Sequence, residues 1–256
     1  MAADPSAASR VVWITGASSG IGRALALNLA KSGNRVAASA RRAGALEELS
    51  AEIEGPGAIA PFPLDVTDHG AAARTFEQIE RSLGEIDVAV LSAGTHLPRA
   101  EGFQAKDLSG LIDINVMGVA NCLEPLIASM VARGRGRIAI VSSVAGYRGL
   151  PTASYYGATK AALINLAEAL HMDLGRHGVT VQVVNPGFVK TPLTDKNTFT
   201  MPFLISAEEA AEHMARGLNS SRFEIAFPLR FVLILKLLRC LPYRLYFPLV
   251  SRATGK

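Results

Sequence analysis

Short apolar runs alternate with longer stretches of helical spacing along most of this chain. The first run, Val11-Val12-Trp13-Ile14, ends at a group of glycines, and similar runs recur at residues 36–40, 58–64, 86–91, 137–141 and 179–184. Such runs are typical of strands buried in a parallel sheet. Helical spacing runs over about 20–31 and stops at Gly33. It recurs over two longer stretches, at about 105–131 and 153–176. We therefore expect strands and helices to alternate.

This alternation predicts the layers of the fold. A strand, a helix and a second parallel strand form a right-handed crossover, and successive crossovers cover both faces of a sheet. The expected fold class is α/β, a single-domain Rossmann-like doubly wound parallel sheet with helices on both faces. A chain of 256 residues can bury roughly 70–75% of its unfolded surface in one domain, and no linker divides the sequence. We expect residues 1–256 to form one dinucleotide-binding domain.

A glycine-rich turn follows the first apolar run and opens the first helical stretch. Gly16 allows backbone angles that are closed to other residues, while Gly20 and Gly22 allow close approach of a pyrophosphate and of the sheet. Free amides at the start of a helix attract phosphates. A tight turn without a ligand is the simpler alternative, but its place between strand and helix favours a dinucleotide site. The residues expected to contact the cofactor here are Gly16, Ser18, Ser19, Gly20, Ile21 and Gly22.

Two arginines follow the second predicted strand. Dinucleotide folds often carry a carboxylate near this point to hold the ribose 2′-hydroxyl, but this chain has Ala40 followed by Arg41 and Arg42. A carboxylate would repel a 2′-phosphate, whereas a guanidinium can bind one. We therefore expect NADP(H) rather than NAD(H). The alternative is that both arginines only cover the start of a surface helix.

Two further strand ends point toward the same edge of the sheet. Asp65 and Val66 close the third predicted strand and are expected near the adenine, while the fourth strand closes with Ser92, Ala93 and Gly94, near the point where such sheets bind ligands. Either segment could be an ordinary loop.

Tyr156 and Lys160 lie one helical turn apart and so share a helix face, which Tyr155 does not. A free phenol has a pKa near 10, too high for efficient acid–base work at neutral pH. An ammonium about 5 Å away is expected to lower it by roughly two units at an effective dielectric constant near 20. The pair therefore predicts an activated tyrosine that exchanges a proton with a substrate.

Ser143 and Asn115 complete the candidate catalytic set. The Ser143 hydroxyl, at the end of a predicted strand, could hold a substrate carbonyl oxygen as it gains charge. Asn115, within the helical stretch 105–131, could hold a water that passes protons to Lys160. Each residue alone has an ordinary structural reading, as a core aromatic, a loop hydroxyl or a helix-bending amide. Their occurrence together with the glycine turn favours catalysis.

With these motifs the chain resembles the short-chain dehydrogenase/reductases, in their compact single-domain branch, from Val11 to about Thr194. The motifs are Thr15-Gly16 with Gly20 and Gly22, Asp65, Asn115, Ser143, Tyr156 with Lys160, and Pro186-Gly187 with Val189 and Thr191. The resemblance implies a Ser143–Tyr156–Lys160–Asn115 tetrad, in which Tyr156 is the general acid–base and Lys160 also binds the nicotinamide ribose. It implies that Pro186, Gly187, Val189 and Thr191 position the nicotinamide carboxamide.

The same resemblance implies a homodimer or homotetramer paired through the two long helices. One departure from the family pattern is clear, because Ser92-Ala93-Gly94 stands where the family usually has Asn-Ala-Gly. Serine has a shorter hydrogen-bonding side chain, so the departure concerns the stability of the cofactor loop.

Residues 192–205 follow the nicotinamide motif without any sustained period, and their aromatic content predicts a substrate lid rather than a plain connection. We expect the substrate to meet Ser143, Tyr147, Tyr155, Phe199 and Phe203, with Met201, Leu150 and Leu97 as further apolar wall. The low charge here favours a bulky apolar or lipid-like ketone or alcohol.

Residues 227–256 form an apolar, basic C-terminal extension. Pro228 is followed by six basic and no acidic residues, whereas the rest of the chain carries 20 basic and 22 acidic groups. Two hypotheses stay open, contact with an anionic membrane surface and packing on protein. The apolar run is too short to span a bilayer.

The bulk composition excludes several classes of protein. The basic excess is confined to the C-terminal extension, so the net charge of +4 does not indicate a nucleic-acid partner. Cys122 and Cys240 make no disulfide framework, and the five histidines show no metal-ligand spacing. No secretory signal is evident in residues 1–10, so the cytoplasm is the expected compartment, with membrane association as the alternative.

Three functions compete. The first is an NADP-dependent oxidoreductase that moves a hydride to or from a carbonyl or secondary alcohol. The second is a catalytically silent NADP-binding sensor, which would have no need of the acid–base set. The third is an epimerase or dehydratase on the same scaffold, whose larger substrate domain this length does not accommodate.

Overall fold

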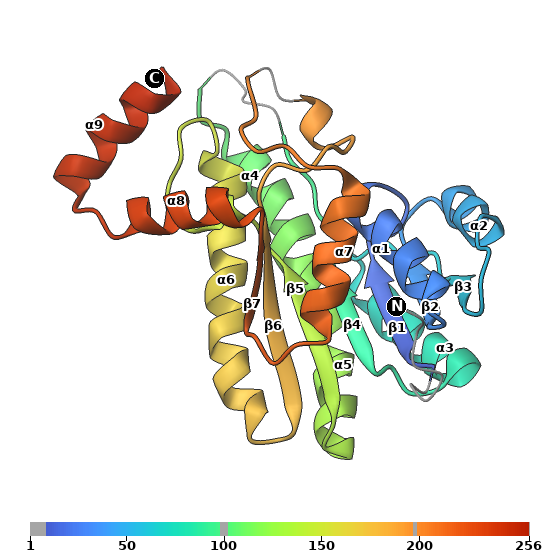
Figure 1. Ribbon diagram of the computed structural model, residues 1–256. Helices are drawn as coiled ribbons and strands as arrows, with labels where there is room; N and C mark the ends of the chain where they lie inside the picture. The colour runs from blue at the N-terminus through green and yellow to red at the C-terminus, as the bar shows by residue number, and fades with distance from the viewer. Residues whose placement is uncertain (1–8, 98–101, 197–198, 256) are drawn as a thin grey trace.

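The computed structural model describes residues 9–97, 102–196 and 199–255. Its strands form one seven-stranded parallel sheet in the order β3-β2-β1-β4-β5-β6-β7 (Figure 1). The strands are β1 Val11–Thr15, β2 Arg35–Ser39, β3 Ala58–Pro61, β4 Val88–Leu91, β5 Gly136–Val141, β6 Val179–Pro186 and β7 Glu224–Phe227. The chain therefore has the doubly wound α/β fold that the sequence predicts.

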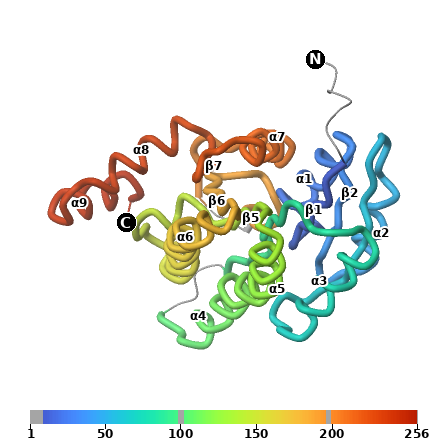
Figure 2. Tube along the Cα trace, turned by 90° about the horizontal axis from the view of Figure 1, so that it is seen from below, coloured from blue at the N-terminus to red at the C-terminus, as the bar shows by residue number. Residues whose placement is uncertain are grey.

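Helices cover both faces of this sheet (Figure 2). Apolar residues of α3, α5, α6 and α8 pack on one face, and those of α1, α2 and α7 on the other. The helices are α1 Gly20–Lys31, α2 Ala43–Ala51, α3 His69–Leu83, α4 Ala105–Ile112, α5 Gly118–Arg133, α6 Ser154–Gly175, α7 Ala207–Leu218, α8 Leu229–Arg239 and α9 Tyr243–Thr254. Each crossover returns the chain to the same end of the sheet, so the loops after the strands meet there.

Most predicted elements agree with the structure to within a few residues. The helix expected over 20–31 is α1, and the one expected over 153–176 is α6. The stretch expected as one helix over 105–131 is helical from Ala105 to Arg133, but a five-residue π-helical turn at Asp113–Met117 separates α4 from α5. The strand expected over 58–64 ends at Pro61.

The seventh strand, β7, has no counterpart in the sequence prediction. It is four residues long and alternates between partly buried and buried positions. It forms because β6 offers an open edge with which Glu224–Phe227 pair in parallel, a long-range contact that so short a run cannot signal.

Candidate active site

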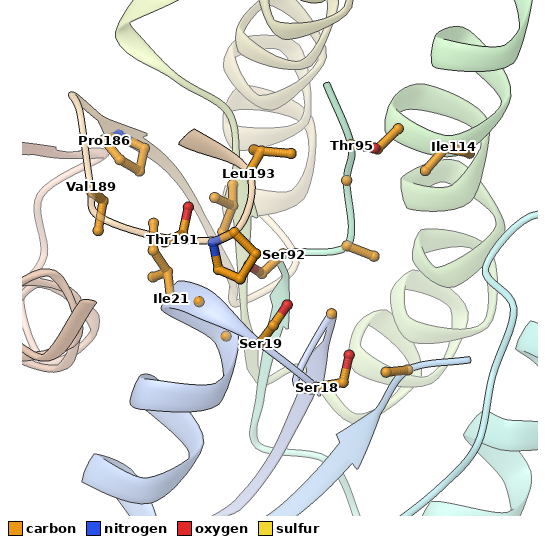
Figure 3. Close-up of a pocket in the computed structure, with 18 of the residues that line it drawn as sticks. Ser18, Ser19, Ile21, Ser92, Thr95, Ile114, Pro186, Val189, Thr191 and Leu193 are labelled. Carbon is orange, nitrogen blue, oxygen red and sulfur yellow. The ribbon is translucent and has the colours of Figure 1, made fainter. Parts of the chain in front are cut away.

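The loops at the carboxyl ends of the strands enclose a cavity of about 680 Å³. Figure 3 shows its wall, with Ser18, Ser19 and Ile21 of the glycine turn on one side. Pro186 at the end of β6, and Val189 and Thr191 in the loop after it, lie on another. All the residues predicted to bind the cofactor line this one cavity: Gly16, Ser18, Ser19, Gly20, Ile21, Gly22, Arg41, Arg42, Asp65, Val66, Ser92, Ala93, Gly94, Tyr156, Lys160, Pro186, Gly187, Val189 and Thr191.

The glycine turn has no room for a side chain at Gly16 or Gly22. Gly16 has a φ of +72°, and a Cβ there would lie 2.9 Å from the backbone of Ala93. A Cβ on Gly22 would lie 2.5 Å from the carbonyl oxygen of Gly16. The first turn of α1, described in full, carries no acidic side chain. The helix start is therefore suited to the negative phosphates of a dinucleotide.

Thr15 joins the glycine turn to the neighbouring loop, a role that sequence analysis missed. Its Oγ1 accepts hydrogen bonds from the backbone N–H groups of Ser92 and Ala93, both at 3.1 Å. The loop with the unusual Ser92 is thus held through backbone amides, which any residue at position 92 except proline could supply.

Arg41, Arg42 and Asp65 meet at one end of the cavity. Arg42 donates to the hydroxyl of Ser18 at 3.4 Å. A hydrogen bond from the backbone N–H of Thr67 lowers the pKa of Asp65, burial opposes this, and the Thr67 hydroxyl and the positive charge of Arg41 lower the pKa further. One carboxylate and two guanidinium groups therefore converge where the sequence predicts the adenosine end of the cofactor.

Tyr156, Lys160 and Ser143 come together at the other end. The Lys160 Nζ donates to the Val141 carbonyl at 3.0 Å and lies 5.5 Å from the centre of the Tyr156 ring. The Ser143 hydroxyl donates to the Pro186 carbonyl at 3.5 Å and hydrogen-bonds Tyr156. A base or acid, a cation and a hydroxyl thus share one wall of the cavity.

Burial dominates the electrostatics of this pair. It raises the pKa of Tyr156 to about 12, against an opposing hydrogen bond from Ser143, and it lowers the pKa of Lys160 to about 8. The expected lowering of the tyrosine pKa by the lysine is therefore not found. Loss of hydration disfavours both charged forms, and at a ring distance of 5.5 Å this outweighs their attraction.

Asn115 lies in the π-helical turn, fully buried and outside the cavity lining. Its amide donates to the Thr95 carbonyl and to the Thr159 hydroxyl, both at 3.0 Å, and its oxygen accepts from the Thr95 N–H at 2.7 Å. A Cβ on Gly94 would lie 3.2 Å from this oxygen and 3.5 Å from the Lys160 Nζ. The side chain positions the Gly94–Thr95 segment, and its part in a proton relay stays a prediction.

The structure does not bring the other predicted substrate residues to the described cavity wall. Tyr147 is buried beside β7, where its hydroxyl donates to Glu224. The Tyr155 hydroxyl accepts from the backbone N–H of Gln104. Phe199 and Phe203, from the predicted lid, pack on Phe188 and Phe231, respectively. Residues 197 and 198 of that lid lie outside the described residues.

Sequence reasoning missed several cavity residues. They are Ala40, Leu64, Thr95, Ile114, Val141 and Ser142, whereas Pro192, Leu193 and Thr194, which also line the cavity, belong to the predicted lid. Most flank a motif that was recognised, so proximity in sequence could have identified them. Ile114 also neighbours a motif residue, Asn115, but the sequence gives no sign of the π-helical turn in which the structure places it at the wall.

Comparison with known proteins decides the family. A protein-family model described as short chain dehydrogenase matches residues 10–201. The chain belongs to the short-chain dehydrogenase/reductase family. An uncharacterized oxidoreductase of Myxococcus xanthus is 38% identical over 239 residues, which cover 93% of this chain and 94% of that protein. The 3-oxoacyl-acyl-carrier-protein reductase FabG of Thermotoga maritima is 35% identical over 189 residues, 73% of this chain and 77% of that one.

Solved structures of the family agree. A short-chain dehydrogenase from Sphingobium yanoikuyae in complex with NADPH is 25% identical, has a TM-score of 0.77 and covers 91% of this chain and 97% of its own. This short-chain dehydrogenase/reductase is thus an NAD(P)-dependent oxidoreductase. Among the residues that the structure describes, no three histidine, cysteine or acidic side chains group closely enough to hold a metal ion.

Proposed function

We propose that this short-chain dehydrogenase/reductase transfers a hydride between NADP(H) and a carbonyl or secondary alcohol of a bulky apolar substrate, with Tyr156 as general acid–base. The observation that carries the proposal is the shared cavity, in which Tyr156, Lys160 and Ser143 face the same space as the glycine turn. A bound nicotinamide dinucleotide supplies or accepts the hydride. The residues of the chain orient the reactants and move the proton.

The protonation states suit proton donation to a carbonyl oxygen. With a pKa of about 12, Tyr156 is a neutral phenol at pH 7 and can donate its proton to the substrate oxygen. Lys160, with a pKa of about 8, is still mostly charged at that pH and stabilises the phenolate left behind. The Ser143 hydroxyl can hold the substrate oxygen as charge builds up on it.

The preference for NADP(H) rests on Arg41 and Arg42. Both line the cavity just beyond β2, and their side chains are exposed at its rim. A flexible, hydrated guanidinium can close on a 2′-phosphate with charge-assisted hydrogen bonds, whereas it gains little from a hydroxyl.

The preference for an apolar substrate rests on the surroundings of Tyr156. The His96 ring packs edge-on against the Tyr156 ring, with centres 5.2 Å apart, and the next side chain, Leu97, is 39% exposed. Phe199 of the predicted lid packs on Phe188, which directly follows the cavity residue Gly187. Aromatic and apolar side chains therefore lie next to residues of the cavity.

We also propose a homo-oligomer paired through the α4–α5 stretch and α6. Three large apolar side chains are exposed on these elements, Ile112, Met117 and Met172, at 38%, 48% and 72%. Pairing would remove them from water.

The proposed chemistry is tested by Tyr156→Phe, with its neighbour Tyr155→Phe as the matched control. Loss of the proton donor is expected to lower kcat/KM for NADPH-dependent reduction of bulky apolar ketones by about 10²–10⁴-fold, with NADPH affinity retained. The Tyr155 variant should keep its rate within a few-fold, since its hydroxyl bonds the backbone near Gln104. Full activity of Tyr156→Phe would remove this tyrosine from the mechanism. Tight NADPH binding without turnover of any ketone by the wild type would favour the sensor.

A further inference from the structure

Helices α8 and α9 extend from the edge of the sheet beside β7 and project from the body of the molecule (Figures 1 and 2). Few of their side chains are buried: Phe231, Val232 and Leu235 in α8, and Tyr246 and Val250 in α9. The first three pack into the core on the α6 side of the sheet. The two helices therefore carry much more apolar surface than the domain covers.

Contacts with Arg148 fix the bend between the two helices. Its guanidinium donates to the carbonyls of Leu238, Arg239 and Leu241 at the end of α8. It also lies 4.6 Å and 4.0 Å from the ring centres of Tyr243 and Tyr246 in α9. The Tyr246 hydroxyl donates to the Gly149 carbonyl at 2.7 Å. The outward surface of α9 is thus held in one orientation.

That outward surface is apolar and basic. Eight large apolar side chains are between 48% and 70% exposed: Leu229, Leu233, Ile234, Leu237, Tyr243, Leu245, Phe247 and Leu249. Arg230, Arg239, Arg244 and Arg252 are exposed among them, and the sequence has no acidic residue after Glu224. We call these twelve side chains the tail surface. Apolar groups interleaved with unopposed cations are typical of helices that lie in a membrane interface.

We propose that the tail surface docks this enzyme on an anionic lipid bilayer. Charge complementarity selects this partner over a second copy of the chain, because a two-fold contact would pair the tail surface with itself. The contact would then hold eight arginines, four from each copy, without a carboxylate from α8 or α9, which is unfavourable. Anionic headgroups supply the missing negative charge, and the bilayer covers the apolar side chains.

The docking is peripheral. Helices of 11 and 12 residues, separated by Pro242, are too short to cross a hydrocarbon core, which takes about 20 residues. Among the described residues, the only helical stretch long and apolar enough to span a membrane is Ala105–Arg133, 44% of whose most apolar window is buried in the domain. Core helices of soluble proteins can have the same length and composition, so this stretch does not support membrane docking.

Helix α8 also contacts the predicted substrate lid. Phe231 of α8 stacks on Phe188 and Phe203, with ring centres 5.6 Å and 5.8 Å apart, and Phe199 packs on Phe188. Phe199 and Phe203 are themselves 50% and 43% exposed. A bilayer that covers the tail surface therefore also meets the lid, and an apolar substrate dissolved in it has a short route to the cavity. This last step rests on the proposed function, whereas the docking does not.

The test is co-sedimentation of the full-length protein, without substrate, with vesicles of phosphatidylcholine alone or mixed with equal parts of phosphatidylglycerol. We expect binding to the mixed vesicles that weakens with salt. The triple variant Arg230→Gln, Arg244→Gln, Arg252→Gln should bind about 100-fold more weakly at low salt, about five-fold for each cation. Leu237→Ser with Phe247→Ser should weaken binding by about ten-fold or more, because both side chains lose apolar burial. The charge control is the triple variant Arg74→Gln, Arg81→Gln, Arg176→Gln, with the first two changes on α3 and the third just beyond α6. It should bind like the wild type.

Three results would overturn the docking. The first is equal binding to neutral and mixed vesicles, and the second is equal loss in both triple variants. The third is a folded wild type that binds no vesicles and is a dimer in solution, together with a Leu237→Ser, Phe247→Ser variant that is a monomer. This result would assign the tail surface to a second copy. Because no substrate is present, each result is independent of the proposed activity. Vesicle binding by an enzyme that reduces no apolar ketone would leave the docking intact and reject only the route to the cavity.

Discussion

Lys160 is a buried cation whose position serves the site at a cost to the fold. It is 4% exposed, and burial lowers its pKa from 10.5 to about 8. Below pH 8 the folded protein must hold this charge away from water, where it contacts the Val141 carbonyl and the Tyr156 ring. Tyr156 does not compensate this charge, since its raised pKa keeps the phenol neutral. Residues kept for chemistry commonly destabilise the fold that holds them.

The first prediction is that Lys160→Met stabilises the protein at neutral pH while it lowers activity. A pKa lowered to about 8 corresponds to a destabilisation of the wild type by about 3 kcal/mol at pH 7. The variant gains less than this amount, because methionine leaves the Val141 carbonyl without its donor. The folded pKa lies below the unfolded one, so the penalty is complete below pH 8 and disappears as pH rises toward 10.5. Urea unfolding of both proteins from pH 6 to 10 measures this.

The control for this prediction is Lys31→Met, which removes an exposed lysine at the end of α1. It should change the free energy of unfolding by no more than about 0.5 kcal/mol at any pH. A constant difference between wild type and Lys160→Met across the pH range would show that Lys160 is not the titrating group.

The second prediction concerns the discrimination between cofactors. If Arg41 binds a 2′-phosphate, Arg41→Ala should raise the Kd for NADPH by about 10–100-fold, the value of one or two charge-assisted hydrogen bonds. The Kd for NADH should change by no more than about two-fold, since no phosphate is lost. Fluorescence titration with both cofactors measures the two constants. Arg42→Ala is the companion variant, and equal weakening of NADPH and NADH by Arg41→Ala would remove the case for phosphate recognition.

Among the elements, the π-helical turn between α4 and α5 bears most directly on the site. Sequence periodicity correctly predicts a helical stretch here, but the helix gains one residue per turn over Asp113–Met117. This insertion brings Ile114 to the cavity and turns Asn115 inward to Thr95 and Thr159. π-Helical turns occur frequently at functional sites, in keeping with this position.

The third prediction is that Asn115→Ala destabilises the protein by about 2–4 kcal/mol, because three hydrogen bonds are lost and the partly buried Thr95 amide and carbonyl lose this partner. Asn121→Ala is the matched control, a buried asparagine of α5 with a single hydrogen bond to the Val66 carbonyl, and should cost about 1 kcal/mol. Denaturant unfolding measures both. Because Thr95 lines the cavity, the Kd for NADPH should rise in the Asn115 variant. Equal losses of stability in the two variants would contradict the positioning role.

Over the whole molecule, the α/β sheet and the helical tail are attached unequally. The sheet is continuous from β3 to β7, whereas α9 touches the body through few residues, chiefly Tyr246, Val250 and the contacts with Arg148. Within the described chain, no residue of α8 or α9 lines the cavity. Cofactor binding and the attachment of the tail are therefore separable.

The fourth prediction is that a chain ending at Leu241 keeps its affinity for NADPH. Loss of the buried Tyr246 and Val250 should cost about 3 kcal/mol, or about 6–12 °C in Tm for a protein of this size. Tyr246→Phe, which removes only the hydrogen bond to Gly149, should cost about 1 kcal/mol. Thermal unfolding with and without NADPH measures both. If the shorter chain no longer binds NADPH, α9 supports the cavity and the two parts are not separable.

Local patterns along the chain were enough to predict the layers, the glycine turn and most residues of the cavity. These are local properties: a strand, a turn and a helix carry their period and their glycines within a few residues, and parallel strands bring their carboxyl ends to one edge. Ser143, Tyr156 and Lys160 could be identified because one strand end and one helical turn position them.

The other features depend on contacts between distant segments, which form only in the folded molecule. The pairing of β7 with β6, the inward turn of Asn115 and the core position of Tyr147 beside Glu224 have no local signature. The protonation state of Tyr156 depends on the packed molecule in the same way. Spacing brought Lys160 near Tyr156, but the depth of the cavity wall, a property of the packed molecule, raised the pKa of the phenol instead of lowering it.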